Sequence, residues 1–469
     1  MDNIIETTVN GKDIVYDVLS GCIADNIIAL EKYVDENSIE RQIDNPHAEQ
    51  DKMQGFFFVL TTKCNLSCDY CYSVTQNKPR SMKKEEPVNI IKKYLREDAK
   101  YILINFFGGE PTLEMDTIRY TVEYLKTIKN RSIYLRISTN GITTKDTLDY
   151  LIDNRFHITV SSDGIFDEGS SLDKVCKANY VDKTLRYLAA HNAFFTVRYT
   201  ATNINYKNLV QSINYWKSIG VLLAHIEPYH PIGSRKEEQE LLPLVDDYVN
   251  TFLSAIDEAE KNGLLVTTGA YMNLLTPSSY FCTGASGRFS VYNPDGSITT
   301  CYRVQSFESK YKNFIIGNWK TGETNNNWEN NIKNLNKHTI DSMRPCSSCS
   351  NRYLCSGGCL MRNLTQSGNV DVADKWLCAV KRKILKDAVR RIWESFSKGD
   401  IPVILGRFII EDYLARNPSL FVDVCSPIKL QGTTICSING VFDLFKCLGI
   451  NRKDELAVFN RKIARTECL

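Results

Sequence analysis

Three cysteines packed into one short loop constrain this chain more than any other feature. Residues 64–71 read Cys-Asn-Leu-Ser-Cys-Asp-Tyr-Cys, which places thiols at Cys64, Cys68 and Cys71. A cubane iron–sulfur cluster is normally closed by four thiolates. A loop with three therefore leaves one iron open for a ligand from a substrate or cofactor. The spacing alone leaves a zinc site or a group of buried thiols as alternatives.

The composition narrows the class of protein. The 469 residues are 43% hydrophobic and carry a formal net charge of +2, so no nucleic acid or membrane partner is indicated. The N-terminus lacks the basic start and apolar run of a signal peptide, and no apolar stretch approaches the length of a membrane span. We therefore expect a soluble, cytoplasmic protein. Sixteen cysteines in a reducing compartment favour metal ligation over disulfides.

Apolar runs that alternate with amphipathic segments predict an α/β fold. The first run, residues 56–62, ends where the cysteine loop begins. Further strands are predicted at Ile102–Phe107, Ile133–Ser138, His157–Ser161, Phe194–Tyr199 and Leu222–Glu227. Between them, residues 114–128 have a helical spacing of apolar side chains. Six such units predict a parallel sheet in a partial (βα)6 TIM-like barrel, with its chemistry at the carboxyl ends of the strands.

We expect four segments along the chain. Residues 1–52 are predicted to form a small α+β segment, in which a hairpin of Ile5–Val9 and Ile14–Val18 turns at Asn-Gly and a helical stretch, 25–36, follows. The other segments are the barrel, a cysteine-rich domain organised by metal, and a C-terminal extension of unassigned role, at residues 53–275, 276–385 and 386–469. A basic amphipathic helix is predicted at Lys375–Phe396. The extension has four cysteines without metal-like spacing, which we expect to be free thiols: Cys425, Cys436, Cys447 and Cys468.

The cysteine loop and the turn after the second strand resemble the radical S-adenosylmethionine (SAM) enzymes. Tyr70 is the aromatic residue before the third cysteine, and the second strand ends in Gly-Gly-Glu-Pro at residues 108–111. Glycines let the backbone approach a ligand closely, and a carboxylate can accept from an ammonium group. The resemblance implies that Cys64, Cys68 and Cys71 hold a [4Fe–4S] cluster whose electron cleaves SAM to a 5′-deoxyadenosyl radical.

The resemblance extends to the later strand ends. Residues 138–141 and 161–164 offer hydroxyl and carboxylate groups that suit a ribose. Arg198 matches the cation that pairs with the SAM carboxylate, and Ile226 is either an adenine-packing residue or a barrel core position. The implied SAM-binding set is Tyr70, Gly108, Gly109, Glu110, Ser138, Asn140, Ser161, Asp163, Arg198 and Ile226.

A second group of cysteines resembles the SPASM domain of peptide-modifying radical SAM enzymes. The resemblance implies two auxiliary [4Fe–4S] clusters, one held by Cys346, Cys349, Cys355 and Cys378, the other by Cys282, Cys301 and Cys359. Sulfatase-maturing relatives have a further cysteine shortly after the first, whereas residues 283–288 contain none. The second auxiliary cluster is therefore expected to keep one iron open. Two zinc ions in place of the clusters are the alternative.

An open iron on an auxiliary cluster narrows the function. It can bind a substrate thiolate at fixed geometry, which suits thioether formation. Tyr302 follows Cys301, where sulfatase-maturing relatives have a catalytic Asp, and this difference weakens the sulfatase interpretation. Residues 11–21 look like the start of a peptide-recognition domain, and such domains bind a leader peptide as an added strand.

We therefore expect a radical SAM peptide maturase that forms Cys thioether crosslinks in a ribosomally made precursor. The implied partners are a precursor peptide with a leader and an electron donor such as flavodoxin or ferredoxin. The alternative enzymes oxidise Ser or Cys of a sulfatase or form carbon–carbon crosslinks in a peptide. The alternatives without catalysis are an Fe–S electron-transfer protein and a zinc scaffold, neither of which needs the Gly-Gly-Glu-Pro turn.

Overall fold

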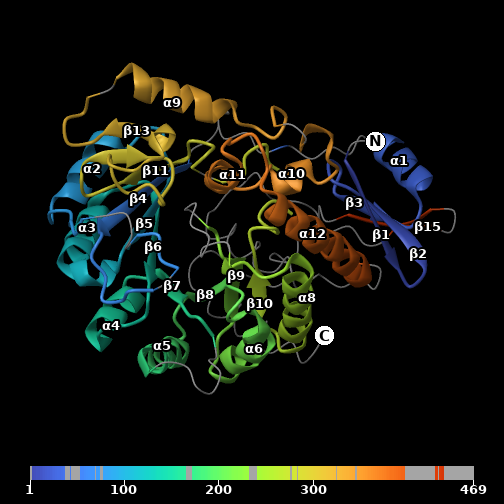
Figure 1. Cartoon of the computed structure of the whole chain (residues 1–469), viewed down its shortest axis with the longest axis horizontal. Coiled ribbons are helices and arrows are strands. Elements are labelled where there is room, and N and C mark those ends of the chain that lie inside the picture. The colour runs from blue at the N-terminus through green and yellow to red at the C-terminus, as the bar shows by residue number, and fades with distance from the viewer. Residues whose placement is uncertain are drawn as a thin grey trace. The chain divides into compact units, whose positions relative to one another are not determined.

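The computed structural model describes most of the chain up to residue 396 and two short strands beyond it. The described residues are 3–36, 43, 53–68, 70–73, 78–164, 172–231, 240–274, 277–282, 284–323, 325–343, 346–396, 428–430 and 433–437. The predicted free thiols Cys425, Cys447 and Cys468 lie outside these residues, as do the side chains of Cys176 and Cys436. The chain forms two compact units, each assembled from separate stretches (Figure 1). The boundaries of the four predicted segments stay a prediction.

The second unit, Pro46–Tyr199 with Cys282–His338, is built on a mostly parallel sheet. Its neighbouring parallel strands are β4 (Met53–Thr61), β5 (Tyr101–Gly108), β6 (Ser132–Thr139), β7 (His157–Ser161) and β8 (Phe195–Ala201, which runs past the unit's boundary). On the other side of β4 the sheet continues through β11 (Phe289–Tyr292), β12 (Ser297–Thr299) and β13 (Ile315–Asn318). Only β11 of these three runs parallel to its neighbour β4; β12 and β13 are antiparallel.

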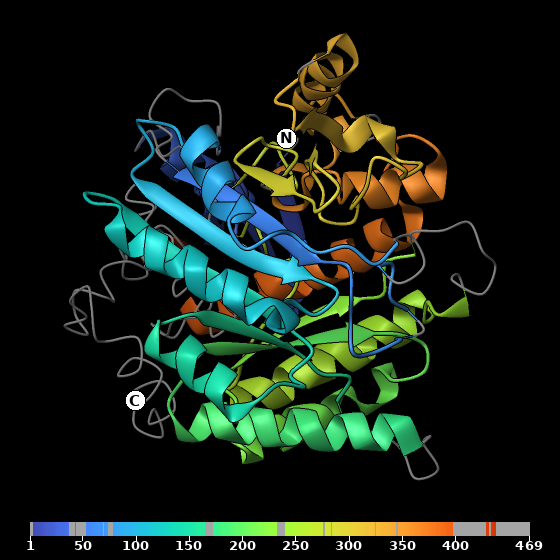
Figure 2. The same ribbon diagram turned by 90° about the vertical axis from the view of Figure 1, so that its left-hand side faces the viewer.

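Helices cover one face of this sheet. They are α2 (Glu86–Tyr94), α3 (Met115–Thr127), α4 (Lys145–Asp153) and α5 (Leu172–Ala190), with α9 (Asn326–Lys337) near β13 and α2 beside α3 (Figures 1 and 2). In β5 the residues alternate in burial, so that Ile102, Ile104 and Phe106 are fully buried and their neighbours only half-buried. This alternation gives the sheet one apolar face and one face that can carry polar groups.

The first unit, Met1–Asn45 with Thr200–Phe281 and Thr339–Leu469, contains the sixth predicted strand. Strand β9 (Leu223–Pro228) is parallel to β10 (Leu265–Thr267), with α6 (Leu209–Ser218) before it and α8 (Val245–Lys261) between the two. Each strand predicted for the barrel is thus present within a few residues of its predicted range, and the α/β partial-barrel fold class is confirmed. The predicted helix Lys375–Phe396 is confirmed as α12, after α10 (Arg352–Cys355) and α11 (Leu360–Ser367).

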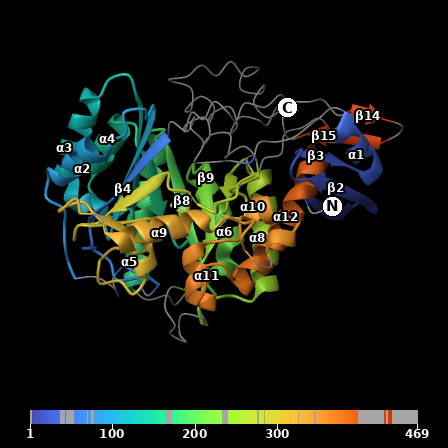
Figure 3. The ribbon, with the colours of Figure 1, turned by 90° about the horizontal axis from the view of Figure 1, so that it is seen from above.

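The N-terminal residues of the first unit form the predicted hairpin. Strands β1 (Ile4–Val9) and β2 (Lys12–Asp17) are antiparallel, and Asn10 and Gly11 turn with φ of 51° and 78°, as a two-residue hairpin turn requires. The sheet continues through β3 (Cys22–Ala24) to β15 (Thr433–Ser437) and β14 (Ile428–Leu430) (Figure 3). Helix α1 (Ile27–Glu36) matches the predicted helical stretch and packs near β3.

Candidate functional site

The cysteine loop begins directly after β4 and is held by the end of β6. The side chain of Asn140 donates to Asn65 Oδ1 at 2.7 Å and to Cys64 Sγ at 3.7 Å. Within the loop, the backbone N–H of Cys71 donates to the carbonyl of Cys68 at 3.0 Å. Partial burial raises the pKa of Cys64, and the nearby charges of Glu110 and Cys71 raise it further. The three predicted ligands of the SAM cluster therefore share one short, partly exposed loop.

The two glycines after β5 allow this strand end to pack against the start of the loop. A Cβ on Gly108, whose φ is +150°, would lie 2.2 Å from the carbonyl oxygen of Thr61, and one on Gly109 would lie 2.1 Å from that of Lys63. In their place the backbone N–H groups of Gly109 and Glu110 donate to these two oxygens at 2.8 and 2.9 Å. No side chain fits here, because both obstacles are backbone atoms.

Glu110 joins the ends of β5 and β6. It is 0% exposed. Its Oε1 accepts from the backbone and hydroxyl of Thr112 at 3.1 and 2.7 Å and from the hydroxyl of Thr139 at 2.8 Å. Its Oε2 accepts from the backbone N–H of Asn140 at 2.7 Å. Burial raises the pKa of Glu110, and these hydrogen bonds lower it in part. The predicted contact with the amino group of SAM stays a prediction, and the structure adds a positioning role for this carboxylate.

Tyr70 ties the loop to the residues after β7. Its hydroxyl donates a short hydrogen bond to the carboxylate of Asp163. Burial raises the pKa of Tyr70 well above its usual value, and Asp163 and the thiolates of Cys68 and Cys71 act in the same direction. Two residues from the predicted SAM-binding set thus contact each other and brace the loop between two of its cysteines.

The remaining predicted SAM-binding residues lie at later strand ends. Ser161 of β7 pairs in register with Arg198 of β8, and Ser138 of β6 pairs with Thr159. Residues opposite each other on parallel strands share a face, and this face is half-buried at Ser138, Ser161 and Arg198. Ile226 lies on β9 in the first unit and is fully buried. The roles of these four residues in SAM binding stay predictions.

In the second unit, the segment after Cys282 passes close to the residue before Cys301. Gly284 lies so close to the residue before Cys301 that a Cβ on it would be 2.0 Å from the carbonyl oxygen of Thr300 and 3.8 Å from Cys282 Sγ. Cys359, the third predicted ligand, belongs to the first unit, where it occupies the N-cap position of α11 without a side-chain capping hydrogen bond. The common ligand role of the three stays a prediction.

The exit of the cysteine loop meets the segment after Cys301. The Ser73 hydroxyl and Gln305 Oε1 are 2.7 Å apart in a buried contact. Burial raises the pKa of Tyr72 well above its usual value, and among the nearby charges Cys71 and Cys301 both raise it further. Tyr72 therefore lies within electrostatic reach of a predicted ligand of the SAM cluster and a predicted ligand of an auxiliary cluster.

Tyr302 is packed in an aromatic cluster. Its ring stacks on Phe57 with centroids 5.4 Å apart and an interplanar angle of 11°, and it meets Phe107 edge-on at 5.4 Å. These residues come from β4 and β5. The side chain that follows Cys301 is therefore an aromatic ring held by the sheet, where the sulfatase-maturing pattern has a carboxylate.

Four thiols gather in the first unit. The pKa of Cys346 is raised to about 11 by burial and then by the charges of Cys355, Cys378 and Cys349. Arg382 opposes this rise and donates to Cys349 Sγ at 3.6 Å. Four soft donors fit a [4Fe–4S] cluster. Among the described residues, no group of three or more His, Cys, Asp or Glu is close enough to hold a single metal ion.

Several residues of these sites were not predicted. Thr139 and Asn65 carry loop contacts, Gln305 joins the loop to the segment after Cys301, and Arg382 contacts a thiol. Thr139 belongs to the Ser-Thr-Asn-Gly motif at residues 138–141, so the sequence could have indicated its role in the site. Asn65 lies inside the cysteine motif and Arg382 on the predicted basic helix, but the partners of Arg382 and Gln305 lie 33 and 232 residues away, and no local pattern indicates these contacts.

The chain is similar to known proteins in sequence. Residues 58–211 match the family model of the radical SAM superfamily. The chain is 24% identical over 374 residues to the radical SAM cyclopropyl synthase TigE of Paramaledivibacter caminithermalis, a match that covers 73% of this chain and 75% of TigE. It is 32% identical over 187 residues to MJ1632 of Methanocaldococcus jannaschii, a candidate glycyl-radical enzyme activating enzyme, covering 39% of this chain and 69% of that protein. The chain therefore belongs to the radical SAM superfamily, and it is an enzyme that uses SAM and a [4Fe–4S] cluster.

Solved structures share its fold. The structure of anSMEcpe with bound AdoMet matches with a TM-score of 0.62 at 19% identity and covers 78% of this chain and 98% of that one. The structure of Streptococcus suis SuiB bound to the precursor peptide SuiA matches with a TM-score of 0.50 at 14% identity and covers 80% of this chain and 98% of SuiB. In the part of the chain that the structure describes, no helix is long and apolar enough to cross a lipid bilayer.

Proposed function

We propose that this radical SAM enzyme modifies a ribosomally made precursor peptide and joins its Cys thiols to carbon atoms as thioethers. The two cysteine groups of SPASM type support a peptide substrate. So does the likeness of fold to SuiB, whose structure holds a precursor peptide. The leader of the precursor is proposed to bind the N-terminal sheet, in which β1 is an edge strand.

The residues of the cysteine loop fit the cofactors of the family. Cys64, Cys68 and Cys71 are proposed to hold the cluster that binds SAM. When bound, the cluster and SAM supply a radical able to remove hydrogen from an unactivated C–H bond. Asn140 holds the loop from the end of β6, and Tyr70 ties it to Asp163, which follows β7. These contacts keep the loop in one geometry, which a reaction of this kind needs.

Two further clusters are proposed for the remaining cysteines. One cluster has a complete set of four ligands: Cys346, Cys349, Cys355 and Cys378. Their proximity is supported by the pKa of Cys346, which the charges of the other three thiolates raise. Cys282, Cys301 and Cys359 form an incomplete set. A redox partner such as flavodoxin or ferredoxin is proposed as the electron donor.

The observation that carries the thioether proposal is this incomplete set. Residues 283–288 contain no cysteine, and we propose that a thiolate of the peptide takes the fourth position. Forming a thioether removes one hydrogen atom from carbon, one proton from the thiol and one electron, and a bound auxiliary cluster would supply an acceptor for that electron.

Carbon–carbon bond formation is the second candidate. It is favoured by the match to TigE, which is named a cyclopropyl synthase, because a cyclopropyl ring is closed by a carbon–carbon bond. Oxidation of a sulfatase Ser or Cys is disfavoured, because the ring of Tyr302 is stacked on Phe57 at the position of the catalytic carboxylate.

The test is anaerobic turnover of the reconstituted enzyme with Cys-containing peptides from any short reading frames found beside its gene. Thioether and carbon–carbon crosslinks both remove two hydrogen atoms, so mass alone does not separate them. Alkylation of the product does, because each thioether consumes one free thiol and each carbon–carbon bond leaves it reactive. A product with all its thiols free would overturn the thioether proposal, and SAM cleavage without any peptide product would overturn the peptide proposal.

A further inference from the structure

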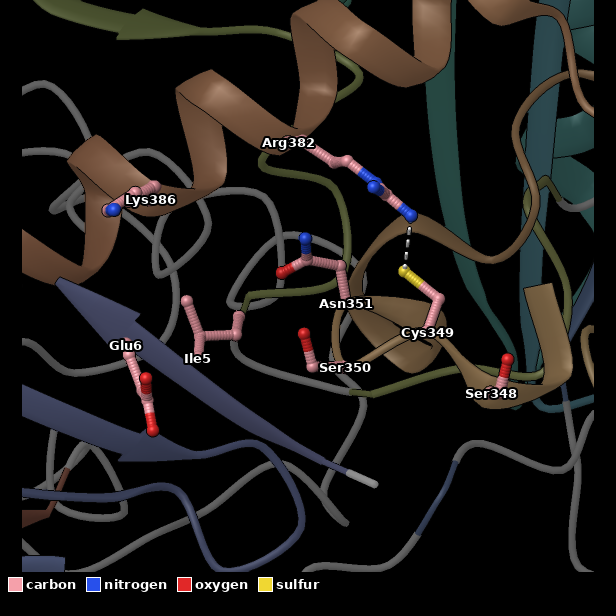
Figure 4. Close-up of a pocket in the computed structure, with 8 residues that line it drawn as sticks. All are labelled: Ile5, Glu6, Ser348, Cys349, Ser350, Asn351, Arg382 and Lys386. Carbon is pink, nitrogen blue, oxygen red and sulfur yellow. Dashed lines mark hydrogen bonds between the residues drawn. The ribbon is translucent and has the colours of Figure 1, made fainter. Parts of the chain in front are cut away.

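The four-cysteine group of the first unit lies beside two cations from α12. Cys378 is in the first turn of this helix, and Lys381 and Arg382 follow it by three and four residues, so all three side chains lie on neighbouring positions of one helix face. Arg382 is exposed and donates from its guanidinium to Cys349 Sγ at 3.6 Å. Figure 4 shows this side chain reaching from the helix to the sulfur.

Lys381 approaches the same group from the buried side. Its side chain is 3% exposed, and its ammonium donates to the carbonyl of Cys355 at 3.5 Å. The same ammonium lies 4.1 Å from the centre of the Phe281 ring, in the range of a cation–π contact. Burying a cation costs desolvation free energy. The contacts of the Lys381 ammonium with the Phe281 ring and the Cys355 carbonyl offset part of this cost.

One of the four cysteines, Cys349, also lines a cavity. A cavity of about 360 Å³ is lined by Cys349, Arg382 and Lys386, and by Ile5 and Glu6 of β1 (Figure 4). Of the two cations that line this cavity, Arg382 is the one that donates to the Cys349 sulfur. Arg382 is also within electrostatic reach of Cys378 and Cys346.

Positive charge, hydrogen bonds to sulfur and solvent exposure all act on the potential of an iron–sulfur cluster. A cubane with four thiolates is negative, and it gains one more negative charge on reduction. A nearby cation stabilises the reduced form more than the oxidised form, because the attraction grows with the charge.

We propose that Arg382 is a tuning residue that raises the reduction potential of the cluster bound by Cys346, Cys349, Cys355 and Cys378. This inference rests on the proposed auxiliary clusters. The tuning role of Arg382 gives the two auxiliary clusters different functions. The four-cysteine cluster is complete and tuned by charge for electron transfer, and the three-cysteine cluster is left for ligand binding.

The experiment is a redox titration of the full chain, reconstituted anaerobically and followed by electron paramagnetic resonance. The signal of the four-cysteine cluster is assigned by its absence from Cys346→Ala. In Arg382→Gln the midpoint potential of that signal should move to a more negative value, and in Arg382→Lys, which keeps the charge, it should move less. Lys386→Gln is the matched control, because it removes a cation from the same cavity that makes no contact with sulfur. Its shift should be smaller than that of Arg382→Gln.

The outcomes separate the two proposals. If Cys346→Ala removes no iron and no signal, the proposed ligand set is wrong and the inference fails with it. If the cluster is present and Arg382→Gln shifts its potential no more than Lys386→Gln does, the tuning role alone is refuted. If both Arg382 variants lose the cluster, Arg382 is needed for assembly, and the tuning role is again refuted.

Discussion

Replacing Glu110 with Gln tests the most densely bonded side chain of the SAM site. The carboxylate accepts three hydrogen bonds on Oε1 and one on Oε2. An amide oriented to keep the three bonds from Thr112 and Thr139 turns its NH2 group toward the backbone N–H of Asn140, so a donor faces a donor. The opposite orientation turns the NH2 group toward the backbone N–H of Thr112 and loses that bond, while the hydroxyls of Thr112 and Thr139 can accept from it. In either orientation, one buried backbone N–H, of Asn140 or of Thr112, therefore loses its acceptor.

The magnitude follows from that lost bond. An unsatisfied buried donor costs about 1–3 kcal/mol, and we expect the free energy of unfolding to fall by about that amount. Asn140 also holds Asn65 and Cys64, so the change reaches the cysteine loop. We expect the affinity for SAM to fall at least about tenfold, which corresponds to about 1.4 kcal/mol, with the cluster content unchanged.

The assay is SAM binding to the reconstituted protein by equilibrium dialysis, alongside anaerobic denaturation. Glu123→Gln is the control, because this carboxylate is exposed on α3 and forms a surface ion pair with Lys126. Thr139→Val separates the two roles of Glu110, because it removes one of the hydrogen bonds and leaves the carboxylate. Unchanged SAM affinity in Glu110→Gln would refute the role of this carboxylate.

The pH dependence of this variant has a defined sign. Burial raises the folded-state pKa of Glu110 above its ordinary value. The stability that such a group contributes is fully present below the unfolded pKa and is lost as pH rises through the folded pKa. The difference in unfolding free energy between the wild type and Glu110→Gln should therefore shrink with rising pH in that range. A difference that grows with pH would contradict net stabilisation of the protonated form.

Three further substitutions test the cysteine loop. The triple change of Cys64, Cys68 and Cys71 to Ala should abolish SAM cleavage and lower iron from about twelve to about eight per chain; retained cleavage would contradict the ligand assignment. Gly109→Ala places a methyl group 2.1 Å from a backbone oxygen. We expect it to lower the free energy of unfolding by about 1–3 kcal/mol and to weaken SAM binding, both measured as for Glu110→Gln. Unchanged stability would show that the loop can shift. Tyr70→Phe removes the hydrogen bond to a carboxylate, worth about 1.5–3 kcal/mol, and the SAM cluster should be lost faster to a chelator than in wild type; equal rates would argue against the brace.

The sequence predicts the scaffold of this protein well, because scaffold elements have local signals. The apolar run at 56–62 corresponds to β4, and the Asn10-Gly11 turn does form the hairpin. The glycines at 108 and 109 are predicted as a close backbone approach, although the backbone they approach is the start of the cysteine loop.

The partners of polar residues are not predictable in the same way. The sequence predicts that Glu110 contacts SAM, which stays a prediction, and it does not predict the hydrogen bonds that its carboxylate accepts from Thr112, Thr139 and Asn140. The sequence shows a carboxylate after a strand, but it does not show which donors the next strand end will bring. Arg382 likewise belongs to a run of basic residues that, read alone, is an ordinary solvated helix face.

The contact between Ser73 and Gln305 connects the two cysteine groups of the second unit. The two residues are 232 positions apart, yet their side chains meet in a buried contact at 2.7 Å. Gln305 also donates to the carbonyl of Tyr302 at 3.1 Å. The exit of the SAM loop and the segment after Cys301 are thereby fixed to the same backbone. A shift at either cysteine group is resisted by the other, because separating them would leave buried polar groups without partners.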